Sequence, residues 1–175
     1  MAAQPQPGDV LLVRTGGFAG RLIRLGAALR DEPNLVNHVA VVSHTDKAGT
    51  LWCLEGRPGG VGWRDAGDYL ASRWTVTNAA QPKTETQRQL VVRGAAAMIG
   101  TSYDWEAIAA DGVAALDLGA LWHPRWGKVP GHVVCSSLAA YLYGRAGLPR
   151  PVGGREVTPA MWLSFIITNE YEGQR

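Results

Sequence analysis

Short apolar runs with strand-like alternation and longer stretches with helical spacing follow one another along the chain. The strand-like runs cover residues 10–14, 38–44, 50–55, 61–63 and 74–77. The helix-like stretches cover residues 18–30, 85–99, 105–121 and 135–143, and a short helix is expected to begin near 158–159. Residues 121–131 and the polar tail 169–175 are expected to form loose segments. The pattern predicts an α+β fold in which a small antiparallel sheet packs against helices, in one domain spanning residues 1–175.

Two of the predicted helices carry further local signals. In the first, three leucines can share one face while two arginines lie off it: Leu22, Leu25, Leu29, Arg21 and Arg24. Ahead of the second, Thr84 and Gln87 have the spacing of a capping box.

The runs 38–44 and 50–55 predict a hairpin, and its register can be worked out by arithmetic. If His44 faces Gly49, the loop has the common length of four residues, 45–48. Partners in an antiparallel pair have a constant index sum, here 93, and side chains alternate between the two faces. The register then pairs three sets of residues on one face: Val42 with Leu51, Ala40 with Cys53, and His38 with Glu55.

Composition and charge narrow the functional class. The net charge of +2 over 175 residues, without a run of lysines or arginines, argues against nucleic-acid binding. The first ten residues lack the features of a secretory signal, and no apolar stretch approaches the ~20 residues that cross a bilayer. A cytoplasmic protein is the simplest expectation, with release by phage lysis or association with a virion as the alternative.

Cys135 begins the predicted helix 135–143, directly after a loop rich in proline and glycine. Backbone N–H groups and the helix dipole stabilise a thiolate at such a position, and the same N–H groups can bind an oxyanion. A cysteine taken alone is more often a small buried side chain than a nucleophile. The start of the helix, the preceding loop and the following Ser136-Ser137 favour the nucleophile here.

His38 begins the predicted strand 38–44, and the proposed register places it opposite Glu55. A carboxylate opposite an imidazole fixes its tautomer and stabilises the imidazolium. An ordinary cross-strand charge pair at the end of a sheet is the alternative. Two other histidines compete as bases: His44, which lies next to the hairpin loop and is expected to be exposed, and His132, three residues before Cys135.

A metal site and a tryptophan-lined surface are two further kinds of candidate site. The chain has no C-x-x-C or H-E-x-x-H spacing, so a metal site is not expected. Trp122 and Trp126 lie among basic residues, and we expect them to pack or to form a lid over substrate. Contact of this loop with a membrane surface is the less favoured interpretation.

The motifs PGDVLLV, NHVAVV, the strand that ends in Glu55, GTSYDW and VVCSSLAAYLYG occur in this order. Together they resemble the circularly permuted papain-like cysteine hydrolases of the NlpC superfamily, in particular the YiiX-like group. Lecithin:retinol acyltransferase-like proteins are more distant relatives of that group. The resemblance extends from about Pro7 to Pro159, and in this group the histidine strand precedes the cysteine helix.

The resemblance implies a permuted papain-like fold with Cys135 as nucleophile, His38 as base and Glu55 as orienting carboxylate. Tyr103 matches part of a Tyr-Asp feature of the group and is expected to line the substrate pocket. Relatives commonly carry an acidic residue soon after the nucleophile, where this chain has Ser136-Ser137. The family's substrate preference therefore does not transfer directly.

The sequence thus predicts a thiol peptidase or amidase that forms a thioester and needs neither metal nor organic cofactor. A peptide or peptidoglycan-like amide is the expected substrate. Hydrolysis or transfer of lipid esters by the same triad is one alternative, and a non-catalytic binding or phage-structural module is another. The oligomeric state is left open by the sequence.

Overall fold

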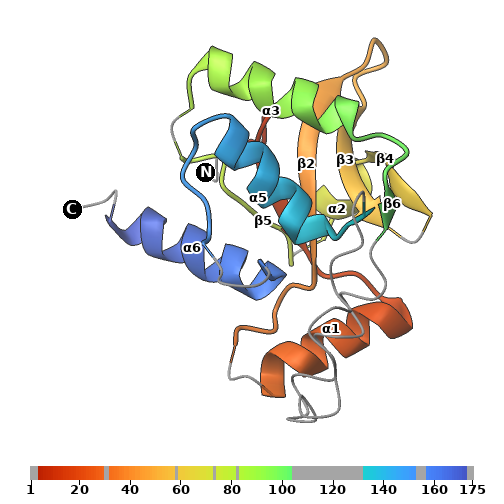
Figure 1. Ribbon diagram of the computed structural model, residues 1–175, viewed down its shortest axis with the longest axis vertical. Helices are drawn as coiled ribbons and strands as arrows, with labels where there is room; N and C mark the ends of the chain where they lie inside the picture. The colour runs from red at the N-terminus through yellow and green to blue at the C-terminus, as the bar shows by residue number, and fades with distance from the viewer. Residues whose placement is uncertain are drawn as a thin grey trace.

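A five-stranded antiparallel sheet forms the centre of the protein, with the strand order β4-β3-β2-β1-β5 (Figure 1). The computed structural model describes residues 4–29, 32–57, 59–72, 74–81, 83–103, 132–152 and 157–172. The strands are β1 (Val10–Val13), β2 (His38–Thr45), β3 (Leu51–Arg57), β4 (Gly60–Asp65) and β5 (Val76–Thr77). The prediction of a small antiparallel sheet in an α+β fold is confirmed.

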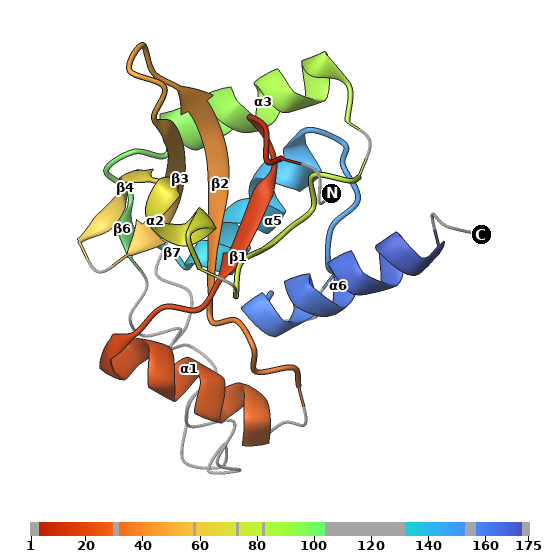
Figure 2. The same ribbon diagram turned by 180° about the vertical axis from the view of Figure 1, so that it is seen from behind.

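Helices cover the sheet unequally. The described helices are α1 (Gly17–Leu29), α2 (Gly67–Leu70), α3 (Glu85–Ala97), α5 (Cys135–Arg145) and α6 (Pro159–Glu172). Helices α3, α5 and α6 lie on one side of the sheet and α2 on the other, while α1 lies beyond one end of the strands (Figures 1 and 2). A short parallel pair joins β6 (Ser102–Tyr103) to β7 (His132–Val133). No helix in the described part of the chain is both long enough and apolar enough to cross a bilayer.

The structure bears differently on three expectations from the sequence, namely the capping box, the loose tail and the segment 105–131. The capping box of α3 is present, because Gln87 N donates to Thr84 Oγ1 at 3.2 Å and Thr84 N donates to Gln87 Oε1 at 2.9 Å. The prediction of a loose tail from residue 169 was wrong, since α6 continues to Glu172. That helix is held by the buried side chains Trp162, Leu163 and Ile166, and this packing extends it beyond its apolar part. The predicted helix 105–121 and the loop 121–131 lie outside the described residues.

The alternation of side chains along the strands builds two separate apolar layers. Leu12, Val39 and Leu54 point toward the helices and pack with residues such as Leu138 and Trp162. Leu11, Val13, Ala40, Val42 and Cys53 point to the opposite face, where they pack with Ala66 and with Tyr69 of α2. His38 and Glu55 have the strand parity of this second layer.

The hairpin register differs from the predicted one. The ladder pairs Val41 with Leu54 and Val42 with Cys53, then shifts by one residue to pair His44 with Trp52. The index sum is 95 for the pairs nearer His38 and 96 after the shift, so the predicted pairings with a sum of 93, including His38 opposite Glu55, were wrong. The turn is closed by Asp46, which accepts hydrogen bonds from two backbone N–H groups and from Trp52 Nε1. These bonds favour a longer loop than the four residues expected from common hairpin lengths.

Candidate active site

Cys135 is the first residue of α5, a helix that is anchored by hydrogen bonds at two points along its length. At its start, the carbonyl of Ser136 accepts a hydrogen bond from Trp162 Nε1 at 3.1 Å. Further along, the Tyr143 hydroxyl donates to Gly8 O at 2.8 Å, which ties the helix to the segment preceding β1. The residue before Cys135, Val134, has an extended backbone and supplies no side-chain cap. The first N–H groups of α5 therefore remain available to the thiol or to a bound oxyanion.

His38 and Glu55 form a buried ion pair at the end of the sheet. His38 Nε2 lies 2.8 Å from Glu55 Oε2, and the two residues are 7% and 2% exposed. The actual register places them diagonally rather than directly opposite. Because the register differs from the predicted one by two residues, both side chains keep the same face of the sheet. Contact between His38 and Glu55 therefore survives although the predicted pairing does not.

Two further side chains hold the Glu55 carboxylate. The Tyr69 hydroxyl of α2 donates to Glu55 Oε2 at 2.7 Å. The Arg57 guanidinium forms an ion pair with Glu55 Oε1 and donates to the Tyr69 hydroxyl. Oε2 thus accepts from Tyr69 and faces His38, while Oε1 accepts no hydrogen bond among the described residues and has only the ion pair with Arg57. Arg57 and Tyr69 act through Glu55 and are positioning residues in this arrangement.

The thiol and the imidazole come from opposite faces of the sheet and meet where two strands separate. Cys135 packs with the layer on the helix side, whereas His38 has the opposite parity. The ladder between β2 and β3 ends at the pair Val41–Leu54. Beyond that point the Cys135 thiol lies next to His38 and the backbone N–H of Val39, and both groups lower the pKa of the thiol. The end of the ladder therefore opens the space in which nucleophile and base meet.

Electrostatics favour a thiolate–imidazolium pair. Burial opposes the charge on His38, but the Cys135 thiolate and the Glu55 carboxylate outweigh it and raise the pKa of His38 to about 9. Burial alone would raise the pKa of Cys135. The charge and hydrogen bond of His38, with the N–H groups of Val39 and Ser136, instead lower that pKa below its usual range. Burial likewise opposes ionisation of Glu55, yet its bonds from His38 and Tyr69 and the charge of Arg57 lower its pKa.

The second cysteine has the opposite environment. Cys53 is fully buried in the layer on the α2 side of the sheet. Burial and the nearby negative charge of Glu55 raise the pKa of its thiol to about 12. The same chain therefore contains one thiol prepared for ionisation and one that remains protonated, which provides an internal reference for reactivity.

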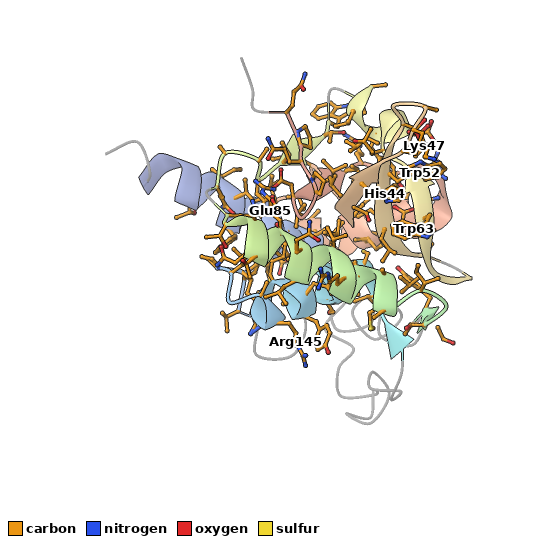
Figure 3. The ribbon with its side chains drawn as sticks, turned by 90° about the horizontal axis from the view of Figure 1, so that it is seen from above. His44, Lys47, Trp52, Trp63, Glu85 and Arg145 are labelled. Carbon is orange, nitrogen blue, oxygen red and sulfur yellow. The ribbon has the colours of Figure 1, made fainter. Side chains whose placement is uncertain are left out.

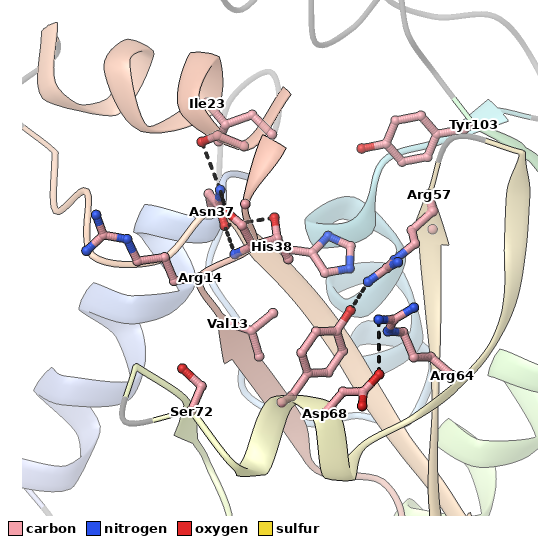
Figure 4. Close-up of a pocket in the computed structure, with 15 residues that line it drawn as sticks. Val13, Arg14, Ile23, Asn37, His38, Arg57, Arg64, Asp68, Ser72 and Tyr103 are labelled. Carbon is pink, nitrogen blue, oxygen red and sulfur yellow. Dashed lines mark hydrogen bonds and ion pairs between the residues drawn. The ribbon is translucent and has the colours of Figure 1, made fainter. Parts of the chain in front are cut away.

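A cavity of about 550 Å³ lies beside His38 (Figure 4). Its wall includes Tyr69 and Gly56, together with Tyr103, the residue predicted to line the pocket. A Cβ built on Gly56 would lie 3.5 Å from both Cys135 N and the Tyr103 ring. The missing side chain at position 56 thus leaves room beside the Cys135 N–H, where an oxyanion would form.

The other candidate residues fall elsewhere. His44 is exposed and makes an edge contact with Trp63 at the far end of the hairpin, with ring centroids 5.2 Å apart (Figure 3). His132 lies in β7, but its side chain is not among those described. Trp122 and Trp126 lie outside the described residues. Within the described ranges, no group of three or more histidine, cysteine or acidic side chains is placed to hold a metal ion.

Arg57 and Tyr69 were not anticipated from the sequence. Arg57 could have been found by alternation, since it stands two residues after Glu55 and therefore on the same face. Tyr69 gave no comparable signal. It lies on the four-residue helix α2, which is too short for a periodic pattern, and its role follows from tertiary packing alone.

Comparison with models of protein families finds no matching family, and comparison with curated proteins finds no matching sequence.

Proposed function

We propose that the protein is a cysteine hydrolase in which Cys135 is the nucleophile, His38 the general base and acid, and Glu55 the orienting carboxylate. The observation that carries the proposal is the buried chain of contacts from the Cys135 thiol through His38 to Glu55. A thiolate paired with an imidazolium at a helix start is an activated nucleophile.

The reaction divides into two steps. The Cys135 thiolate attacks the acyl carbonyl, and the resulting oxyanion lies beside the N–H of Cys135 in the space left by Gly56. The C–N bond then breaks as the His38 imidazolium gives its proton to the leaving amine, and a thioester remains. Neutral His38 next takes a proton from water, the hydroxide attacks the thioester, and the acid leaves as the thiolate–imidazolium pair is restored.

The order of the elements supports a circularly permuted papain-like fold of the NlpC type. The strand that carries His38 precedes the helix that carries Cys135, and the orienting Glu55 lies on the strand that follows His38 in the chain. The proposed substrate class is an amide bond of a peptide or peptidoglycan-like molecule. The two steps above use only groups of the protein and water, so the proposal includes neither a metal nor an organic cofactor.

A second candidate, hydrolysis of lipid esters by the same residues, is favoured by one observation on α1. Leu25 and Leu29 of this helix are 53% and 48% exposed, and Arg21 and Arg24 lie on the same helix. Exposed leucines beside arginines suit the surface of an anionic bilayer. Amide hydrolysis remains the preferred proposal, because the contacts among Cys135, His38 and Glu55 do not depend on α1.

Turnover of a substrate panel by matched variants tests the proposal. The panel contains muropeptides, acyl anilides and phospholipid vesicles, and the variants are Cys135→Ala and His38→Ala, with Cys53→Ala and His44→Ala as controls. We expect both triad variants to lose turnover while both controls keep it. Amide cleavage that survives in Cys135→Ala would refute the proposal. Release of fatty acid by the wild type alone, with no amide cleaved, would promote the lipid-ester candidate.

The protein would instead be a non-catalytic module if two results were found together. The wild type would cleave no substrate of the panel, and acyl-type activity probes would not label Cys135. The probe measurement is needed because a poor choice of substrates and an inactive site give the same result on the panel alone.

A further inference from the structure

The cavity beside His38 carries an excess of positive charge. Three arginines line it, namely Arg14, Arg57 and Arg64, and the only acidic side chain among its lining residues is Asp68. The charge of Arg57 is neutralised by its ion pair with Glu55, which is not itself a lining residue. Counting both carboxylates against the three guanidinium groups leaves one positive charge on the described wall of the cavity.

Arg14 is the cation that lacks a carboxylate partner among the described residues. Its guanidinium lies over the ring of Trp74, with Cζ 5.3 Å from the ring centroid. This contact uses the face of the guanidinium and leaves its N–H edge available for a bidentate anion. Arg24, which is not a lining residue, lies close enough to Arg14 that burial together with the charges of Arg14 and Arg21 lowers the pKa of Arg24.

Arg64 stands on the opposite side of the cavity and is only partly satisfied (Figure 4). Its Nη2 donates to Asp68 at 3.1 Å, but the Asp68 side chain is 61% exposed. Its Nε is buried and has no hydrogen-bond partner in the described part of the chain. A buried donor without a partner is costly, so the guanidinium of Arg64 is not fully satisfied by the described residues.

The wall that carries Arg14 is held in place. The side chain of Asn37, the residue before His38, accepts from Thr15 N at 2.7 Å and donates to Thr15 O at 3.0 Å and Gly20 O at 2.8 Å. A Cβ on Gly20 would collide with Asn37 Nδ2, so glycine is needed for this close approach. Asn37 therefore fixes the segment that follows Arg14 against the start of β2, next to the catalytic base.

We propose that this cavity binds an anionic group of the acyl substrate, a carboxylate or a phosphate, through Arg14 with Arg64 as the second cation. The inference rests on the proposed function of Cys135 for its claim about substrate. A volume of about 550 Å³ lies within the ~300–1,000 Å³ of pockets that enclose small molecules. The anion selects substrates that carry a negative charge near the bond to be cleaved.

Matched alkylating reagents test the inference without knowledge of the substrate. Each reagent has an iodoacetamide group, from which the Cys135 thiolate displaces iodide, and a tail that ends in a carboxylate, a phosphate or a neutral carboxamide. One to three methylene groups separate the two ends. At the best length we expect the anionic tails to alkylate Cys135 roughly three- to tenfold faster than the carboxamide, as expected of one charge-assisted hydrogen bond at a partly exposed site.

The variant Arg14→Gln should bring this ratio close to one. Its matched control is Arg145→Gln, which removes the same charge from an exposed position in the last turn of α5, about 15 Å along the helix from Cys135 (Figure 3). The control should leave the ratio unchanged. Equal rates for charged and neutral tails in the wild type, or an equal ratio in wild type and Arg14→Gln, would overturn the inference. A preference for only one of the two anionic tails identifies which anion the site takes.

An unreactive Cys135, which would refute the proposed function, can be distinguished from the absence of an anion site. If Cys135 reacts no faster than an ordinary thiol with any reagent, binding is measured directly from the amide NMR signals of Thr15 and Gly56 during titration with acetylglycine or inorganic phosphate. Shifts in the wild type that are lost in Arg14→Gln support an anion site independently of catalysis. No shift with either anion overturns the inference, whatever the reactivity of Cys135.

Discussion

Replacing His38 with glutamine should sharply reduce the reactivity of Cys135 while leaving Cys53 unreactive. The imidazole supplies the positive charge and the hydrogen bond that lower the pKa of Cys135, whereas burial of that thiol acts in the opposite direction. Glutamine keeps hydrogen-bonding capacity but carries no charge. In the variant, burial therefore dominates and the pKa of Cys135 rises.

The magnitude follows from the pKa of His38. Its rise from 6.5 to about 9 corresponds to about 3 kcal/mol of added preference for the charged ring, since one pKa unit is about 1.4 kcal/mol. Glu55 contributes part of that energy, so the share that belongs to Cys135 is smaller. Coupling between two sites is reciprocal, and the same share acts on the thiol. We expect the thiolate fraction near pH 6 to fall about 10- to 100-fold in His38→Gln.

Alkylation by iodoacetamide, resolved at each cysteine by mass spectrometry between pH 4 and 10, measures this effect. Wild-type Cys135 should react well below the usual thiol pKa, and Cys53, with a pKa of about 12, should remain unmodified until the protein unfolds. A wild-type Cys135 that titrates like a free thiol would refute the reasoning. So would a His38→Gln variant with an unchanged rate at pH 6, or a Cys53 that reacts faster than Cys135.

Three further predictions concern turnover. In Glu55→Gln, kcat/KM should fall by about 10²- to 10⁴-fold but remain measurable, because the neutral amide can still accept a hydrogen bond from His38 but loses the charge that stabilises the imidazolium and pairs with Arg57. Activity equal to the wild type would contradict this. In Gly56→Ala, the added methyl crowds the Cys135 N–H at ordinary contact distance, so kcat/KM should fall roughly tenfold with little change in thermal unfolding; an unchanged kcat/KM would place the oxyanion elsewhere. The pH profile of kcat/KM should be bell-shaped. Its acidic limb should lie below the usual thiol pKa and its alkaline limb near 9, as the His38 imidazolium loses its proton. An acidic limb at 8 or above would argue against the ion pair.

The sequence was sufficient for the elements with strong local signals. The strands near His38 and Glu55, the capping box at Thr84 and the helix that begins at Cys135 were all predicted from periodicity or cap chemistry, and the structure contains them. Each depends on residues close together in the chain. Local patterns of this kind determine where an element lies, and strand alternation also assigns each side chain to a face.

Register and tertiary support could not be predicted in the same way. The hairpin arithmetic assumed a four-residue loop, whereas the three hydrogen bonds accepted by Asp46 favour a longer turn and a shift at Val42–His44. The face of His38 and Glu55 was nevertheless right, since a displacement of two residues preserves side-chain alternation. Tyr69 had no local signal for its role at the site, because its hydroxyl contacts Glu55 and Arg57, which lie on β3, 14 and 12 residues earlier in the chain.

The position of the site at the end of the β2–β3 ladder follows from a geometric conflict. The nucleophile begins a helix that packs on one face of the sheet, while the base and its carboxylate have the parity of the other face. A continuous ladder would separate them by its own backbone. The ladder ends at Val41–Leu54, and from there the Val39 N–H is directed to the thiol of Cys135. The interruption in strand pairing thus supplies both the passage between the faces and a donor for the thiolate, which ties the proposed chemistry to this one end of the sheet.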